Sequence, residues 1–328
     1  MTTPEEELDR LESAILAAIT DPVTAEQIPD WTTADDLTRI GIDAMLDTHK
    51  FGRVLASHGN IHITGEGLSD SSARVNDVAR VMTGFQRLTT AVGAAQTGDK
   101  ALGKQANADV QRRTDLLLRA ESSPGAIILG FTPATAPIDE IGDPGMIEEL
   151  ESDEQMLDTA VGAAIEVLAA GNDIGPSALE SAFVDLLSNM GPRTAAAVRD
   201  LAKTLDRARF DIDIAWLQPA RTTRRVHVTA TTAAYIAAIV EHANLDEQPV
   251  TIIGEYLTVS AVASWLIKQD NGDTITVKLG RIDPAQTRGL AVGDRIRVEA
   301  VMRTETVTGG SVKTTYTAQS FERLHHAT

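Results

Sequence analysis

From about residue 250 onward the chain changes from helical spacing to an alternation of apolar and polar residues, and this change constrains the fold more than any other feature. The turn Asp270–Asp273 contains Asn-Gly, which tolerates the positive φ angles of a tight hairpin, and Thr308–Ser311 predicts a second hairpin. Clean alternation indicates strands with one buried and one solvated face. We therefore expect a small antiparallel β-barrel over 246–328, with strands at 250–257, 262–269, 274–279, 295–303 and 313–321.

The layout of these strands resembles an OB-fold, a five-stranded Greek-key barrel. Asp283–Gln286 predicts one helical turn between the third and fourth strands, so that three strands, a connector and two strands follow one another. The resemblance covers 250–323 and rests on this order, which an SH3-like barrel or a lipocalin-type fragment fits nearly as well. OB-folds often bind single strands with stacking aromatics and a basic groove. Here aromatics are few and acids offset the bases, which favours a module that caps the body or meets a partner.

The residues before the barrel mix both periodicities and predict an α+β body at 59–245, preceded by a helical segment at 1–58. Residues 60–64 alternate like a strand, and Ser71 or Ser72 can cap a long amphipathic helix that follows. Short apolar runs on either side of Ser122–Gly125 predict a hairpin.

The second half of the body is expected to contain three helices, two strands and a last helix capped by Thr231-Thr232. Gly191-Pro192 separates two of the helices in the stop-and-restart pattern of a C-terminal glycine and a first-turn proline. The segment 132–151 is rich in Pro, Gly and acids and predicts an exposed linker. The expected helices lie at 154–169, 177–190 and 193–208, the strands at 211–217 and 225–229, and the last helix ends near 243.

Charge is distributed unevenly along the chain. The formal net charge is −18, and residues 120–192 contain acids but no Lys or Arg. Duplex binders normally carry a basic footprint, so we expect no bulk duplex nucleic acid as a partner. The chain has no cysteine, an acidic start and no apolar run long enough to span a bilayer, which together predict a cytoplasmic protein without a membrane partner.

The weak catalytic candidates are Arg53, His58 and His62. Arg53 and His58 match the Arg-x4-His spacing of HEPN-type ribonucleases, although His58 directly precedes a glycine and a strand rather than lying in a helical bundle. His58 and His62 have the spacing of a helical zinc pair, but the strand between them gives the wrong geometry. We therefore predict no metal site and no cofactor.

Arg221, Arg224 and Arg225 form the densest basic cluster, in the turn between two expected strands. Guanidinium groups held together there can clamp a phosphate or a carboxylate, whereas the alternative is salt bridges to the acidic helices. A short internal echo also links Ile61–Thr64 to Val226–Thr229, since both are strands with a central histidine followed by a helix.

These observations favour a non-enzymatic binding or regulatory protein, with a sheet as platform and the barrel as interaction module. Its expected partner is a protein, and a small anionic or nucleic-acid-derived ligand fits the arginine cluster. The alternative is a hydrolase or nuclease-like effector that uses His58 or His62 with nearby carboxylates.

Overall fold

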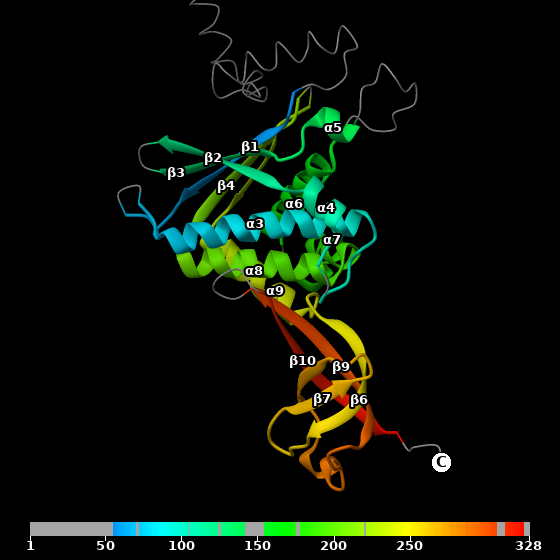
Figure 1. The fold of residues 1–328 in the computed structure, drawn as a ribbon. Coiled ribbons are helices and arrows are strands. Elements are labelled where there is room, and N and C mark those ends of the chain that lie inside the picture. The colour runs from blue at the N-terminus through cyan, green and yellow to red at the C-terminus, as the bar shows by residue number, and fades with distance from the viewer. Residues whose placement is uncertain are drawn as a thin grey trace, which may run out of the picture.

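The computed structural model describes residues 55–69, 72–103, 105–123, 126–141, 154–174, 178–219, 221–306 and 312–324. These residues form helices and two sheets, as predicted (Figure 1). Arg53 and the predicted helices at 1–54 lie outside the described residues. The elements are β1 (His58–Thr64), α3 (Val75–Gln96), α4 (Ala108–Arg113), β2 (Leu116–Ser123), β3 (Ala126–Pro133), α5 (Pro137–Ile141), α6 (Met156–Asn172), η1 (Ala178–Glu180), α7 (Ala182–Met190), α8 (Pro192–Ala208), β4 (Asp211–Leu217), β5 (Arg224–Val228), α9 (Ala230–His242), β6 (Gln248–Thr258), β7 (Trp265–Gln269), β8 (Thr274–Lys278), η2 (Pro284–Thr287), β9 (Arg295–Thr306) and β10 (Val312–Arg323).

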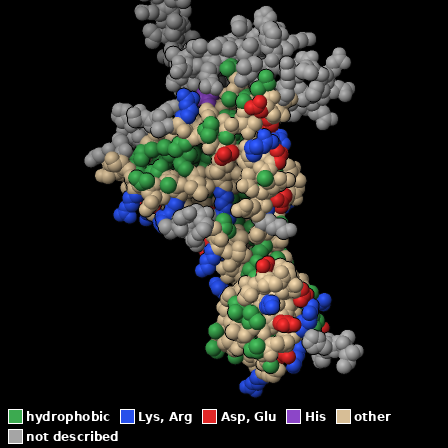
Figure 2. All heavy atoms as spheres, viewed as in Figure 1, with side chains coloured by type: hydrophobic (Ala, Val, Ile, Leu, Met, Phe, Trp, Pro, Cys, Tyr) green, Lys and Arg blue, Asp and Glu red, His purple; other side chains and the backbone are tan. Residues whose placement is uncertain are grey.

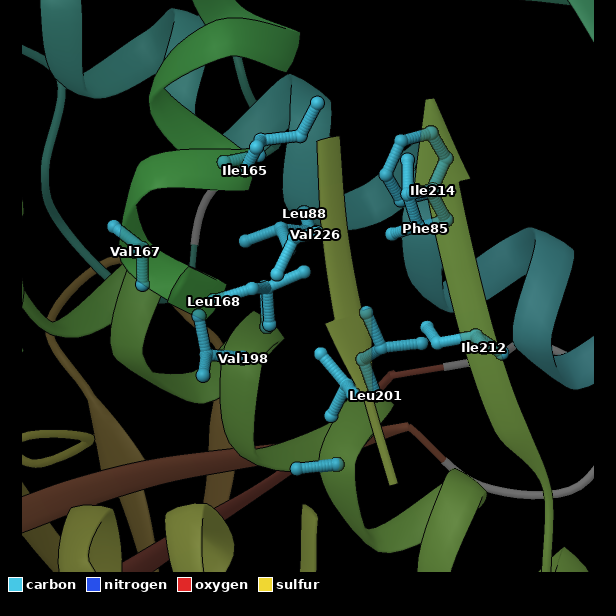
Figure 3. Close-up of a cluster of buried hydrophobic side chains, with 14 of the residues drawn as sticks. Phe85, Leu88, Ile165, Val167, Leu168, Val198, Leu201, Ile212, Ile214 and Val226 are labelled. Atoms are coloured by element: carbon cyan, nitrogen blue, oxygen red, sulfur yellow. The ribbon is translucent and has the colours of Figure 1, made fainter. Parts of the chain in front are cut away.

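The first sheet, here called the body sheet, has the strand order β2-β3-β1-β4-β5, and every pairing in it is antiparallel. Successive side chains of β1 and β4 alternate between buried and half-exposed, as the pleat of a strand requires. The buried set packs against helices on one face of the sheet. Figure 3 shows this core, in which Ile212 and Ile214 of β4 lie close to Phe85 of α3 and Leu201 of α8.

Gly59 sits where the middle of the body sheet is most crowded. Its cross-strand partners are Phe131 on β3 and Trp216 on β4, whose rings stack with centroids 5.6 Å apart. A Cβ on residue 59 would lie 2.6 Å from both the Trp216 ring and the Ala215 carbonyl oxygen. The strand therefore requires glycine here so that the two rings can meet over its backbone.

Helix α8 begins where the sequence predicts, whereas the N-cap residues of α3 and α9 differ from the predicted ones. Gly191 adopts φ +85° and Pro192 begins α8, which confirms the stop-and-restart prediction. The predicted serine caps of α3 are wrong, because Arg74 is the N-cap residue and makes no side-chain cap hydrogen bond. For α9 the N-cap is Thr229, whose hydroxyl accepts from the Thr232 backbone N–H at 3.1 Å, two residues before the predicted cap.

The predicted linker at 132–151 is structured where the structure describes it. Residues 132 and 133 end β3, and α5 follows at Pro137–Ile141. The Glu140 side chain is only 4% exposed. Its carboxylate accepts from Arg113 at 2.7 Å and from the Met156 backbone N–H at 2.8 Å. These bonds satisfy an acid that composition alone assigns to solvent; residues 142–151 lie outside the described part of the chain.

The second sheet contains the five C-terminal strands that the sequence predicts. Their pairings run β10-β8-β7-β6-β9, and β9 pairs with β10 so that the sheet closes. The prediction of a wholly antiparallel sheet is wrong at one seam, because β8 and β10 pair in parallel. β8 and β10 are not consecutive, because η2 and its flanking loops connect β8 to β9. The chain then turns from β9 into the antiparallel β10, which therefore runs parallel to β8. The turn at Asp270–Asp273 forms as predicted, with Gly272 at φ +92°, whereas Thr308–Ser311 lies outside the described residues.

The two sheets have separate cores that meet at one junction. Tyr256 and Trp265 are fully buried inside the second sheet, while the body core comprises other residues. The predicted boundary at 245/246 falls between α9 and β6. At the junction a small cluster of Leu102, Ala196 and Met302 joins the loop after α3, helix α8 and strand β9.

A buried polar network also crosses the junction. Arg199 of α8 is 1% exposed, and its guanidinium donates to the carboxylate of Asp246, to that of Asp200 and to the Thr304 backbone carbonyl of β9. Asp246 is fully buried, and Arg303 lies 3.3 Å from it as a second cation. The network thus ties α8, the segment between α9 and β6, and β9 together.

One edge of the body sheet is apolar and exposed. Leu117 and Leu118 lie on the edge strand β2 and are 53% and 57% exposed. As neighbours in a strand they point to opposite faces of the sheet, so both faces of this edge are apolar. Figure 2 shows hydrophobic side chains gathered on this part of the body, near the beginning of α3.

Candidate functional site

The face of the body sheet that points away from the helical core is largely polar, and we call it the outer face. It is formed by the residues that alternate with the buried ones and are half-exposed or exposed. On β1, β4 and β5 these are His58, Asn60, His62, Thr64, Asp211, Asp213, Ala215, Leu217, Arg225 and His227.

Two histidines flank one carboxylate on the outer face. His62 of β1 and His227 of β5 are the cross-strand partners of Asp213, which lies on β4 between them. His227 Nδ1 lies 2.7 Å from Asp213 Oδ1, and both side chains are about half-exposed (53% and 50%). The contact fixes the orientation of the imidazole and leaves Nε2 as the ring atom for a ligand or a proton.

The predicted catalytic histidines do not form a cluster of their own. His58 and His62 point to the same face of β1, but four residues of strand separate their Cα atoms by about 13 Å. His58 pairs with Leu217 rather than with an acid. In the described part of the chain no group of three or more His, Asp or Glu side chains is placed to hold a metal ion.

The structure does not bring the three predicted arginines together. Arg224 and Arg225 are neighbours on β5 and therefore point to opposite faces. The Arg224 guanidinium lies over α6 in the space left by Gly162, 4.0 Å from Glu166. Arg221 precedes the strand, and its Nε lies 4.0 Å from Glu154.

Arg225 instead joins His227 at a shallow pocket of about 390 Å³, which we call the β5 pocket. The far wall is formed by the C-terminal end of α6 and by the first turn of α9, which brings the hydroxyls of Thr229 and Thr232. Asn172 donates to the His227 backbone carbonyl at 2.6 Å and so fixes α6 to the strand edge. The lining residues Arg225, His227, Thr229 and Thr232 carry groups that can donate to a small anion, and Asp173 is the one acid in the lining.

Sequence reasoning named Arg225 but missed His227 and Asp213. The available signal was the echo between Ile61–Thr64 and Val226–Thr229, because it placed a histidine at matching positions of two strands. What the sequence did not show is that β4 lies between these strands and supplies an aspartate to both.

Two of the aromatic side chains in the barrel lie in its core. Tyr256 and Trp265 are fully buried. The Trp265 ring meets the Tyr256 and Phe321 rings edge-on, with ring centroids 5.3 Å apart in each pair. Burial raises the pKa of Tyr256 far above its usual value, and the nearby Asp294 acts in the same direction. Figure 2 shows acidic and basic side chains intermixed on the visible side of the barrel. Tyr256 and Trp265 therefore stabilise the barrel core and are not available to bases.

No protein-family model, curated protein or solved structure matches the chain. Among the described residues no helix combines the length and apolar character that crossing a membrane requires.

Proposed function

We propose that this is a binding protein that recognises a small anionic ligand in the β5 pocket and uses its C-terminal barrel to contact a partner protein. The observation that carries the proposal is that Arg225 and His227, two residues apart on one strand, line one pocket with Thr229 and Thr232. The proposal requires no cofactor and places the protein in the cytoplasm, in keeping with its lack of cysteine.

The ligand is expected to be small because long-range electrostatics oppose a large polyanion. The net charge of −18 repels duplex nucleic acid, so that only a local cluster can attract an anion. Asp213 also holds His227 by a contact of 2.7 Å, which fixes the position of the imidazole ring that an anion would meet.

We further propose that the barrel is OB-like. Support comes from its order β6-β7-β8-β10-β9, with a short helical turn between β8 and β9 and a parallel seam between β8 and β10. Because Tyr256 and Trp265 are buried, this barrel suits a protein partner better than a single-stranded nucleic acid.

A second candidate function is hydrolysis of a phosphate ester. The pair His227–Asp213 has the geometry of a general base whose orientation is set by a carboxylate, and Arg225 lies on the same face to hold the phosphate. In this alternative the catalytic histidine is His227 and not His58 or His62.

The test uses the full chain and inorganic phosphate as the probe, followed by NMR shifts of the histidine ring protons and by calorimetry. Arg225→Ala should lower phosphate affinity at least about tenfold, since a charge-assisted bidentate contact is lost. Arg221→Ala is the matched control, because Arg221 lies outside the pocket and should leave the affinity unchanged.

Equal phosphate affinity in the two variants would refute the proposal that the β5 pocket binds the anion. Turnover of p-nitrophenyl phosphate that is lost in Asp213→Asn and His227→Ala, but kept in His62→Ala, would establish the hydrolase instead. Absence of turnover with phosphate binding intact would leave the binding function as stated.

A further inference from the structure

A cleft of about 840 Å³ lies between the body and the barrel, far larger than the β5 pocket, and we call it the junction cleft. On the body side it is lined by α3, by the loop after it and by α4, including Arg87 and Gln111. On the barrel side it is lined by Thr304 of β9 and Thr314 of β10, which are direct cross-strand partners. Its volume lies within the range of small-molecule sites in proteins.

The cleft contains a buried hydroxyl without a partner. Thr304 is 2% exposed, and its Oγ1 makes no hydrogen bond in the described structure, although its backbone carbonyl accepts from Arg199. Nearly all buried polar atoms in proteins are hydrogen-bonded, because an unpaired one loses its hydration without compensation. Thr304 lines the cleft, so a ligand that reaches this hydroxyl would supply the missing partner.

The walls of the cleft favour a negatively charged ligand. Three arginines line it, whereas Asp115 is the single acid among its described lining residues. The arginines are fixed by carboxylates that do not line the cleft: Arg87 by Asp200 at 2.6 Å, Arg193 by Asp99 at 3.0 Å and Arg112 by Asp109 at 2.7 Å. The Arg87 and Arg193 side chains are mostly buried, and they therefore present fixed donors to the cleft.

The remaining lining residues suit a ligand that also carries neutral hydrogen-bonding groups. Gln105 and Gln111 bring amides and Thr90 and Thr314 bring hydroxyls, while Leu102 adds an apolar contact. This combination of guanidinium, amide and hydroxyl groups matches a phosphate attached to a sugar and a base.

We propose that the junction cleft binds a phosphorylated small molecule of mononucleotide size and that its occupancy fastens the barrel to the body. Asp200 bridges Arg87 in the cleft to the buried Arg199, and Arg199 in turn holds the Thr304 carbonyl of the barrel. A ligand between Arg87 and the Thr304 hydroxyl therefore contacts both ends of one network. Binding stabilises the docked arrangement by mass action.

The first test compares two valine variants of the full chain in the absence of ligand, since Val matches the shape of Thr. Thr304→Val should leave Tm unchanged or raise it, because the hydroxyl that it removes has no partner. Thr287→Val is the matched control: Thr287 is 6% exposed and donates to the Pro284 carbonyl at 2.7 Å. That control should lower Tm by about 2–4 °C.

The second test measures Tm with AMP, GMP, CMP, UMP or inorganic phosphate at millimolar concentration. At least one nucleotide should raise Tm of the wild-type protein by several degrees and protect β9 from hydrogen exchange, and phosphate alone should do less. The shift should be lost in Thr304→Val and Arg87→Gln and kept in Arg225→Ala, which separates this site from the β5 pocket.

Three results overturn the proposal. One is a fall in Tm for Thr304→Val as large as that for Thr287→Val, because the hydroxyl would then have a protein partner. Another is that none of the five probes moves Tm or the exchange of β9. The third is a nucleotide shift that persists in Thr304→Val and Arg87→Gln, which would place the ligand elsewhere.

Discussion

Arg199→Met tests whether the buried network at the junction stabilises the protein as its geometry indicates. Methionine keeps much of the volume of the arginine stem but removes every donor. The change leaves Asp246, which is fully buried, with Arg303 at 3.3 Å as its only recorded cation, and leaves the Thr304 carbonyl without its guanidinium donor.

The expected loss follows from these contacts. Removing one partner of a buried ion pair costs about 3–5 kcal/mol, because a desolvated charge remains. Since Arg303 still lies near Asp246, we expect the lower end of this range, about 3 kcal/mol of the free energy of unfolding. The double variant Arg199→Met/Asp246→Leu should be less destabilised than the single one, because it removes the stranded charge as well.

The assay is urea unfolding followed by far-UV circular dichroism, with Lys203→Met as the matched control on the same helix. Lys203 is 44% exposed and pairs with Glu241, so its loss should cost no more than about 0.5 kcal/mol. If Arg199→Met were no more destabilising than Lys203→Met, the buried network would contribute nothing to the docking of the barrel. If the double variant had a lower free energy of unfolding than Arg199→Met, the unpaired charge of Asp246 would not be the cause of the destabilisation.

Two further predictions concern packing. Gly59→Ala should destabilise the protein by at least about 2 kcal/mol in urea unfolding, because its Cβ would lie 2.6 Å from the Trp216 ring. Gly84→Ala is the control and should cost far less, because its Cβ would meet the Leu201 side chain at 3.2 Å and the Leu201 Cα at 3.6 Å. A similar cost for both would contradict the crowding at Gly59. Residues 246–328 expressed alone should give a β-rich domain with a cooperative melt, because the barrel has a core of its own. A product that folds only with the body attached would show that the junction is required.

The sequence predicted the elements well where a periodicity and its turn residues agreed. The alternation at 211–217 matches β4 without error, and Asn271-Gly272 marks the hairpin between β7 and β8. It predicted less well where a few specific bonds decide the structure. Glu140 belongs to a segment with the composition of a linker, yet hydrogen bonds from Arg113, Gln155 and Met156 hold it in place.

The candidate sites depended on strand order, which the local sequence does not encode. Arg224 and Arg225 are adjacent in the chain, but the pleat sends one to α6 and the other to the outer face. Asp213 and His227 are 14 residues apart and meet because β4 and β5 pair with that register. Neither the junction cleft nor the unpaired Thr304 hydroxyl can be inferred before the barrel is placed on the body.

The closing of the second sheet by its last strand also orders events during protein synthesis. β10 is the partner of both β8 and β9, so that the sheet stays open until residues 312–323 have left the ribosome. The body sheet needs nothing beyond β5, and its core can form while the barrel is still being translated. In the interval β8 and β9 each present an unpaired edge, which is the state in which a nascent chain associates with other chains. Removing β10 should therefore promote aggregation more than the loss of stability alone would indicate, because both edges then stay unpaired.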